Sequence, residues 1–326
     1  MTIDTLIDDL KQLPELLPAA DLFQGRCDGN PKDEEGKTFR ELNEMFDTWN
    51  AESMLYGIKA LAEVGRKEKN YVYSVYDKEE IEKNPDLAQV KILRFPGDAD
   101  KPFVVLCAGG AYRSVCSLAE SIPVGAAFQS MGYTTFCVNY RTYAPGEVLF
   151  PKPLEDLARS ISFILSHKEE LGVHTEKYAL GGFSAGGNLI QTFALKKVGY
   201  EKYGVKKPDI LFPVYPAISF DLVPDSDKEW FLGAVFGENY KEEDIQKYDV
   251  LPNIAKDYPS CYIVVAEDDH MVDVCNSKML DRKLTDLGIK HNLELGETGR
   301  HGFGDGRGTP LEGWPERAAK FWESLE

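Results

Sequence analysis

Strand-like and helical stretches alternate along most of this chain, and this alternation constrains the fold more than any other feature of the sequence. From residue 71 onward, short apolar runs of strand length are separated by longer runs with helical periodicity. Such alternation is typical of a mostly parallel sheet with helices on both faces. The sequence therefore predicts an α/β fold with a mostly parallel, eight-stranded sheet, whose strands cover residues 71–76, 90–95, 103–108, 134–140, 178–181, 210–214, 261–266 and 292–295.

Two segments fall outside this alternation. Residues 1–68 hold amphipathic helical stretches at 39–49 and 51–64, which predict a helical N-terminal segment that is a candidate lid. Residues 69–326 form the predicted α/β domain. Within it, residues 219–257 interrupt the alternation and are rich in aromatic side chains, so they are a second candidate for a cover over a ligand site.

Charge and composition exclude several classes of partner. The formal net charge of −17 repels nucleic acid and anionic membranes over a Debye length of about 8 Å. The N-terminus carries acids where a secretory signal is basic, and no run of about 18 apolar residues follows, which predicts a cytoplasmic protein without a membrane partner. The six cysteines show no metal-binding spacing, so no metal or cofactor is expected. The sequence is compatible with a homo-oligomer.

The run Gly-Phe-Ser-Ala-Gly at 182–186 places a serine, Ser184, between two glycines where a predicted strand meets a predicted helix. A serine hydroxyl becomes a nucleophile when a base reaches its proton, which requires it to stand clear of its neighbours on a sharp turn. Glycines on both sides remove the side chains that would collide there. Strand, turn and helix together are the context expected of a G-x-S-x-G nucleophile elbow.

Parallel α/β sheets place their ligand sites at the carboxyl ends of the strands, which selects among the candidate partners of Ser184. His301 lies in a glycine-rich loop after the last predicted strand, and it is the histidine whose setting fits a base. The strand at 261–266 is followed by acids, of which Asp269 is our choice to orient the imidazole, with Asp268 and Asp273 as alternatives. The order Ser, Asp, His along the chain is that of α/β-hydrolases.

A reaction at a carbonyl also needs donors for the oxyanion that forms. The small-residue loop Ala-Gly-Gly-Ala-Tyr at 108–112 follows the strand at 103–108 and can bring backbone N–H groups close to a bound substrate. A simple tight turn is the alternative interpretation of these glycines. The nucleophile elbow further along the chain favours the oxyanion loop.

With these motifs in place, residues from about 103 to the C-terminus resemble α/β-hydrolase esterases, and above all bacterial acetyl and feruloyl esterases. These enzymes carry an H-G-G-G or P-G-G-G-Y loop and a G-x-S-A-G-G elbow. Here Ala108 replaces the His or Pro and Ala111 replaces the third glycine. The resemblance implies a catalytic domain at 69–326, and it assigns the nucleophile to Ser184, the acid to Asp269, the base to His301, the oxyanion N–H groups to Gly109, Gly110 and Ala185, and a pocket position to Tyr112.

This resemblance implies a serine carboxylesterase that acts on a small-molecule substrate: a short-chain acyl ester, such as an acetyl or hydroxycinnamoyl ester of a plant oligosaccharide. Two alternatives are open at this point. The same fold and triad serve oligopeptidases, and some hydrolase-like proteins bind ligands without turning them over. The second group usually lacks a triad member, whereas this sequence has a candidate for all three.

Overall fold

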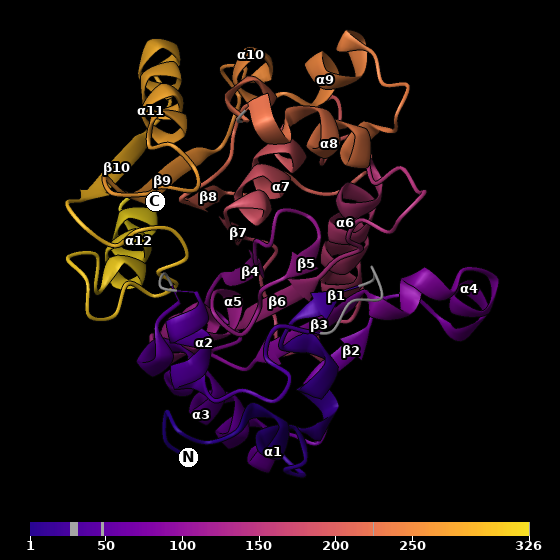
Figure 1. Cartoon of the computed structure of the whole chain (residues 1–326), viewed down its shortest axis with the longest axis vertical. Coiled ribbons are helices and arrows are strands. Elements are labelled where there is room, and N and C mark those ends of the chain that lie inside the picture. Colours follow the sequence, from indigo (N-terminus) through magenta and orange to yellow (C-terminus); the bar gives the residue numbers. More distant parts are fainter. Residues whose placement is uncertain (27–31, 47–48, 224, 326) are drawn as a thin grey trace.

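An eight-stranded sheet forms the centre of the protein (Figure 1). The computed structural model describes residues 1–26, 32–46, 49–223 and 225–325. The strand order is β10-β9-β8-β7-β4-β6-β3-β2, parallel from β10 to β6, with β3 and β2 added antiparallel at one edge. The strands are β2 Val72–Ser74, β3 Lys91–Phe95, β4 Phe103–Cys107, β6 Thr135–Asn139, β7 Tyr178–Phe183, β8 Ile210–Val214, β9 Ser260–Ala266 and β10 His291–Gly296.

Helices cover both faces of this sheet, and each face has its own apolar core. Along β4, Val104 and Leu106 belong to one core, whereas Val105 and Cys107 belong to the other, as the alternation of side chains in a strand requires. The first core contains α5 (Ser121–Ser130) and α12 (Trp314–Glu323), and the second contains α6 (Lys152–Ser166), α7 (Ala185–Phe193) and α11 (Cys275–Leu287). The predicted fold is confirmed as the α/β-hydrolase fold.

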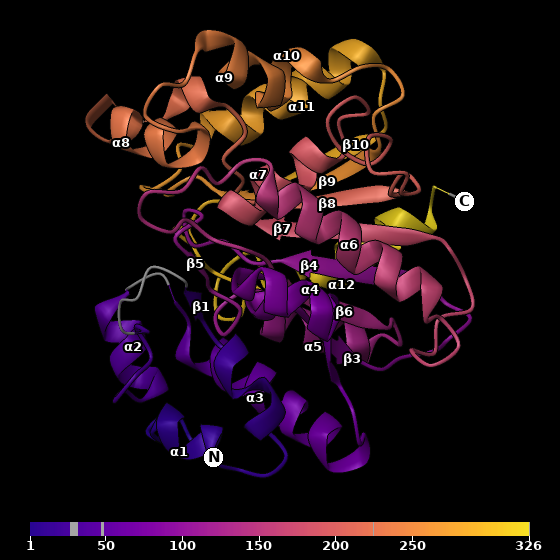
Figure 2. The ribbon, with the colours of Figure 1, turned by 90° about the vertical axis from the view of Figure 1, so that its right-hand side faces the viewer.

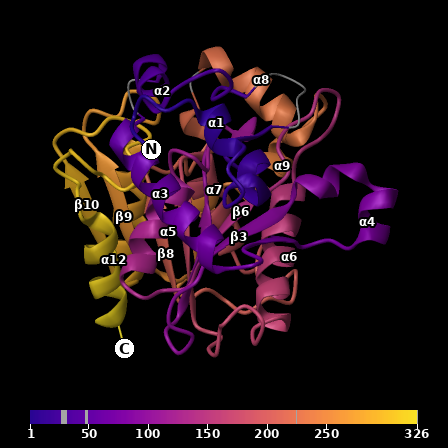
Figure 3. The same cartoon turned by 90° about the horizontal axis from the view of Figure 1, so that it is seen from below.

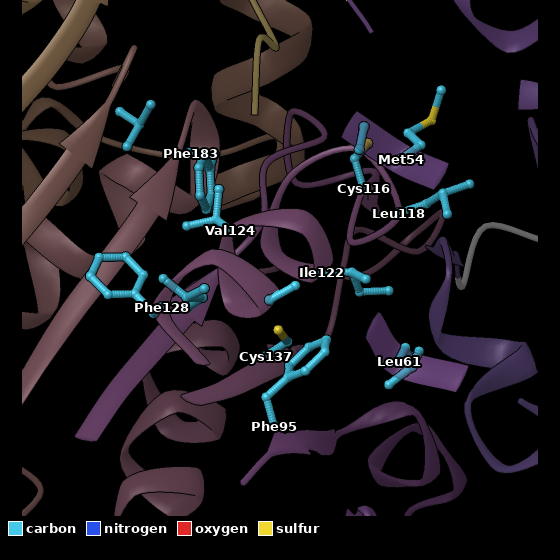
Figure 4. Close-up of a cluster of buried hydrophobic side chains, with 14 of the residues drawn as sticks. Met54, Leu61, Phe95, Cys116, Leu118, Ile122, Val124, Phe128, Cys137 and Phe183 are labelled. Carbon is cyan, nitrogen blue, oxygen red and sulfur yellow. The ribbon is translucent and has the colours of Figure 1, made fainter. Parts of the chain in front are cut away.

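The N-terminal segment is helical, with α1 (Ile7–Lys11), η1 (Leu17–Leu22), α2 (Phe39–Met45) and α3 (Ala51–Lys67). Helix α3 begins at its N-cap Asn50, whose side chain accepts the N–H of Ser53, and it packs on α5. Figure 4 shows Met54 and Leu61 of α3 in one cluster with side chains of α5 and of the sheet. Strand β1 (Gly25–Arg26) also pairs with β5 (Ser114–Val115), a link that the sequence did not indicate. The segment is thus built into the core of one sheet face.

The insertion at 219–257 contains η3 (Phe220–Leu222), α8 (Asp225–Phe236), α9 (Glu242–Tyr248) and α10 (Val250–Asn253). Along the longest axis of the molecule it lies at the opposite end from α1 to α3 (Figures 1 and 2). Viewed along that axis, α2 and α8 project at the same edge of the molecule (Figure 3). Helix α4 (Lys78–Lys83) and η2 (Pro85–Gln89), between β2 and β3, project away from the sheet.

The segment around Ser184 differs from the prediction in its boundaries. Strand β7 continues through Gly182 and Phe183, and α7 begins at Ala185, directly after the serine. The helix ends at Phe193, where the chain turns back and the N–H of Tyr200 donates to the carbonyl of Phe193. Ser184 is therefore the single residue that joins a strand to a helix.

Candidate active site

Ser184 occupies a strained turn at the carboxyl end of β7. Its φ is 51° and its ψ is −118°, a conformation that costs a non-glycine residue of order 1–3 kcal/mol. The neighbouring glycines are required by close contacts. A Cβ on Gly182 would lie 2.3 Å from the carbonyl oxygen of Gly186, and a Cβ on Gly186 would lie 2.1 Å from that of Cys107. The turn is thus held by packing that only glycine at these positions permits.

Ser184 borders a cavity of about 530 Å³. Its lining comes from the loop after β4, the elbow and α7, the chain after β8 with the insertion at 219–257, and the loop after β9 with the start of α11. None of the described residues between 1 and 68 lines this cavity. The lining side chains are mostly apolar, with a few polar groups: Ala111, Tyr112, Arg113, Ser184, Ala185, Asn188, Ala217, Ser219, Phe220, Leu222, Val223, Trp230, Phe231, Met271, Val272 and Asn276.

The structure brings His301 and Asp269 together. Nδ1 of His301 lies 2.8 Å from Oδ2 of Asp269, and the two residues are 7% and 8% exposed. The other carboxylate oxygen, Oδ1, accepts the N–H groups of Met271 at 3.0 Å and Val272 at 2.9 Å. Because an ionised carboxylate only accepts hydrogen bonds, Nδ1 carries the proton and Nε2 is left as the basic nitrogen.

The two alternative acids, Asp268 and Asp273, accept hydrogen bonds from backbone N–H groups. Asp268 accepts the N–H of Arg300 at 2.7 Å. Asp273 accepts the N–H of Cys275 at 2.8 Å at the start of α11, and this hydrogen bond lowers the pKa of Asp273. Among these three carboxylates, Asp269 is the one that reaches the imidazole.

Three other histidines bind groups outside the cavity. His167 contacts the carbonyl of Phe163, His174 pairs with Asp100, and His291 pairs with Asp281. None of these residues lines the cavity that Ser184 borders.

Contacts at the end of β8 connect the loops of Ser184 and His301. The N–H of Ser184 donates to the carbonyl of Val214 at 3.1 Å, and the ring of the next residue, Tyr215, lies 4.7 Å from the imidazole between centroids. Within the described part of the chain, Ser184 and His301 make no direct hydrogen bond. Catalytic hydrogen bonds are often long in unliganded enzymes and tighten with substrate.

The loop after β4 packs directly on the nucleophile, since a Cβ on Gly109 would lie 2.7 Å from Cβ of Ser184. The prediction that Gly109 supplies an oxyanion N–H is wrong for this structure. Its N–H donates at 2.5 Å to Oε2 of Glu120, a buried carboxylate that the sequence analysis missed. An acid within the apolar run just before α5 was the signal that could have found it.

Two of the predicted oxyanion donors are still available. In the described part of the chain, the N–H of Gly110 has no acceptor, and the N–H of Ala185 is one of the first-turn donors that a helix leaves unpaired. Ala185 also lines the cavity, as does Ala111. The N–H groups of Gly110 and Ala185 therefore remain candidates for the oxyanion site.

Tyr112 is one of the residues that line the cavity. The residue is buried, has a positive φ of 58°, and its hydroxyl donates to Oδ1 of Asn188 at 2.8 Å. Asn188 lies on α7, one turn after the elbow, and also lines the cavity. The hydrogen bond ties the loop after β4 to the helix that follows the nucleophile.

No group of three or more metal-ligating side chains occurs among the residues that the structure describes. The helices of that same part of the chain include none with the length and apolar character needed to cross a membrane.

Comparison with known proteins places the chain in a family. The BD-FAE family model matches residues 95–284, more than half of the chain, including Ser184 and Asp269. The chain belongs to the BD-FAE family. A curated relative, endo-1,4-beta-xylanase B of Butyrivibrio fibrisolvens, is 25% identical over 224 residues, which are 67% of this chain and 35% of that protein. The hormone-sensitive lipase of Mus musculus is 36% identical over 88 residues, 27% of this chain and 11% of the lipase. This member of the BD-FAE family thus aligns with about a third or less of these relatives.

Solved structures share its fold. An acetyl ester-xyloside bifunctional hydrolase from Caldicellulosiruptor lactoaceticus superposes with a TM-score of 0.65 at 24% identity, covering 78% of this chain and 96% of that one. A carboxylesterase from Lactobacillus plantarum superposes with a TM-score of 0.62 at 17% identity, covering 72% of this chain and 93% of that one. At these identities the likeness supports the α/β-hydrolase fold.

Proposed function

We propose that this protein is a serine carboxylesterase, a carboxylic ester hydrolase in which Ser184, His301 and Asp269 form a catalytic triad. The observation that carries the proposal is the buried His301–Asp269 pair, 2.8 Å apart, on loops next to the strained serine of a nucleophile elbow. Membership of the BD-FAE family and the esterase names of several solved relatives support the same activity.

The proposed reaction is an acyl transfer in two steps. In the first step, Nε2 of His301 takes the proton of Ser184 as Oγ bonds to the ester carbonyl carbon, and the carbonyl electrons move onto its oxygen. Backbone N–H groups of Gly110 and Ala185 stabilise this oxyanion, each such donor being worth about 10²–10³ in rate. The tetrahedral intermediate then collapses, and the imidazolium gives its proton to the departing alcohol.

The second step releases the acyl group. Water gives a proton to His301 and attacks the carbonyl of the acyl-enzyme, and the Ser184 oxygen leaves with that proton to regenerate the hydroxyl. Asp269 stays ionised throughout and stabilises the imidazolium that forms in each step. The products are a carboxylic acid and an alcohol.

The proposed substrates are small-molecule esters with short acyl groups, acetyl or hydroxycinnamoyl, including those on plant oligosaccharides. The mostly apolar wall that Phe220, Leu222 and Phe231 contribute suits an acyl group, and a cavity of about 530 Å³ lies within the usual range for small ligands. Cavity size supports both acyl classes.

Substitution of the nucleophile tests this function. Ser184→Ala is expected to fold like the wild type and to lose about 10⁶-fold in kcat for p-nitrophenyl acetate, the scale seen when a triad serine is removed. The wild type, but not the variant, should be labelled by an organophosphonate serine probe. Comparable hydrolysis by both proteins would contradict the assignment. Cleavage of proline-containing peptides in place of esters would favour an oligopeptidase, and no labelling of the wild type would favour a binding protein.

A further inference from the structure

Glu120 is a buried carboxylate that the proposed reaction does not use. It precedes α5, is 3% exposed, and in the described part of the chain it forms no ion pair with a lysine or arginine. An ionisable group without a cation is costly to bury.

The two oxygens of Glu120 bind two different loops of the site. Oε2 accepts the N–H of Gly109 at 2.5 Å, and Oε1 accepts the hydroxyl of Tyr215 at 3.1 Å. Gly109 belongs to the loop after β4, whereas Tyr215 follows β8. The carboxylate therefore bridges two segments that are about a hundred residues apart in the sequence.

Each of these partners touches a residue of the triad. Gly109 packs so closely on Ser184 that a Cβ on it would lie 2.7 Å from the serine Cβ. The Tyr215 ring lies 4.7 Å from the ring of His301 between centroids, and its hydroxyl accepts the N–H of Gly304 at 3.4 Å. Displacement of Glu120 would thus free both the oxyanion loop and the support of the catalytic base.

We propose that Glu120 is a positioning residue: its carboxylate holds the loop after β4 through Gly109 and the His301 loop through Tyr215, so that oxyanion donors and base keep their placement around Ser184. This inference rests on the proposed esterase function. Burial raises the pKa of Glu120 to about 7, and the hydrogen bond from Gly109 and the charge of protonated His301 oppose that rise. The same network is thereby coupled electrostatically to the base.

The inference predicts that loss of the Glu120 carboxylate lowers kcat but leaves KM nearly unchanged. In Glu120→Ala the oxyanion donors stay present but lose their support, so kcat for p-nitrophenyl acetate should fall by about 10- to 100-fold, while KM stays within about twofold. This decrease in kcat does not exceed the decrease of about 10²–10³ expected when a whole oxyanion donor is removed. In Glu120→Gln the amide oxygen can still accept the N–H of Gly109, so most of kcat should be recovered.

Two tyrosines provide a matched pair for the second contact. Tyr215→Phe removes a hydroxyl that donates to buried Glu120, and Tyr76→Phe removes one that donates to buried Asp156 at 2.9 Å, outside the site. Both variants should have a lower Tm than the wild type. Only Tyr215→Phe should lower kcat, by about three- to tenfold, since only its hydroxyl supports the base loop.

The experiment measures kcat, KM and Tm for these four variants and the wild type. The proposal would be overturned if Glu120→Ala folds and keeps the wild-type kcat, or if kcat falls as far in Glu120→Gln as in Glu120→Ala. Equal kcat values in the two tyrosine variants would overturn it too. If Glu120→Ala does not fold, the kcat values of Glu120→Gln and of the two tyrosine variants still test the proposal. A wild-type protein without esterase activity or probe labelling would instead remove the proposed function itself.

Discussion

Asparagine in place of Asp269 changes one atom of the site and tests the tautomer on which the mechanism depends. Oδ1 of Asp269 accepts two backbone N–H groups, from Met271 and Val272, while Oδ2 faces Nδ1 of His301. An amide nitrogen cannot accept the two N–H groups, and turning it toward them would leave both donors unpaired at a cost of about 2 kcal/mol or more. The amide oxygen therefore stays with the backbone, and the NH2 group faces His301.

This orientation reverses the hydrogen bond to the imidazole. Nδ1 must now accept from the amide, so the ring proton moves to Nε2, where a lone pair is needed to take the proton of Ser184. Loss of that tautomer at a triad aspartate costs about 10⁴-fold in kcat, equal to about 5 kcal/mol of transition-state stabilisation. Asp269→Asn should show a loss of this size with p-nitrophenyl acetate at neutral pH.

A matched control is Asp273→Asn, because Asp273 lies on the same loop and its Oδ1 accepts the N–H of Cys275 at the start of α11. The amide oxygen of asparagine can accept the same N–H, so this variant should keep its kcat and nearly all its stability. The reasoning is refuted if Asp269→Asn retains kcat within tenfold of the wild type while folded, or if the control loses as much.

Two further predictions concern stability. Gly186→Ala should destabilise the fold by several kcal/mol or prevent folding, because its new methyl group would lie 2.1 Å from a backbone oxygen. Gly233→Ala in α8 has open space at its Cβ and should instead raise the free energy of unfolding by about 0.5–1 kcal/mol. Thermal unfolding of both variants checks this, and a Gly186→Ala protein with wild-type Tm would contradict it. Burial raises the pKa of Glu120 from 4.5 to about 7, so the unfolded chain releases this proton at a lower pH than the folded protein does. The free energy of unfolding should therefore fall by roughly 3 kcal/mol as the pH rises from about 4.5 to 7. Urea unfolding should show a smaller decline over that range in Glu120→Gln than in the wild type, and equal declines would disprove the linkage.

Much of the fold could be predicted because local patterns carried it. The eight strands of the main sheet lie where short apolar runs predicted them, to within one or two residues at most ends. Apolar side chains on consecutive positions have to be buried on both faces, and this requirement is visible in the sequence itself. The same holds for the elbow, where glycines 182 and 186 were predicted from steric need and meet backbone oxygens at 2.3 and 2.1 Å if a Cβ is added.

The site could be predicted only in part, since its contacts join distant segments. Position after a strand restricted the acid to a few candidates, but only the folded chain shows Asp269 facing His301 while Asp268 and Asp273 bind backbone N–H groups. The assignment of Gly109 as an oxyanion donor failed for the same reason. Its N–H direction depends on Glu120, and that contact belongs to no local pattern.

The sequence by itself determined the parallel α/β sheet, the serine at the end of β7 and the chain order of its candidate partners, because periodicity and steric needs at a turn are local properties. Tertiary structure alone decided which carboxylate meets the imidazole, which N–H groups remain free for substrate, and that the insertion at 219–257 lines the cavity while the described helices of the N-terminal segment pack into the core. These outcomes depend on the direction of hydrogen bonds and on burial between segments far apart in the chain, and both arise only when the sheet assembles.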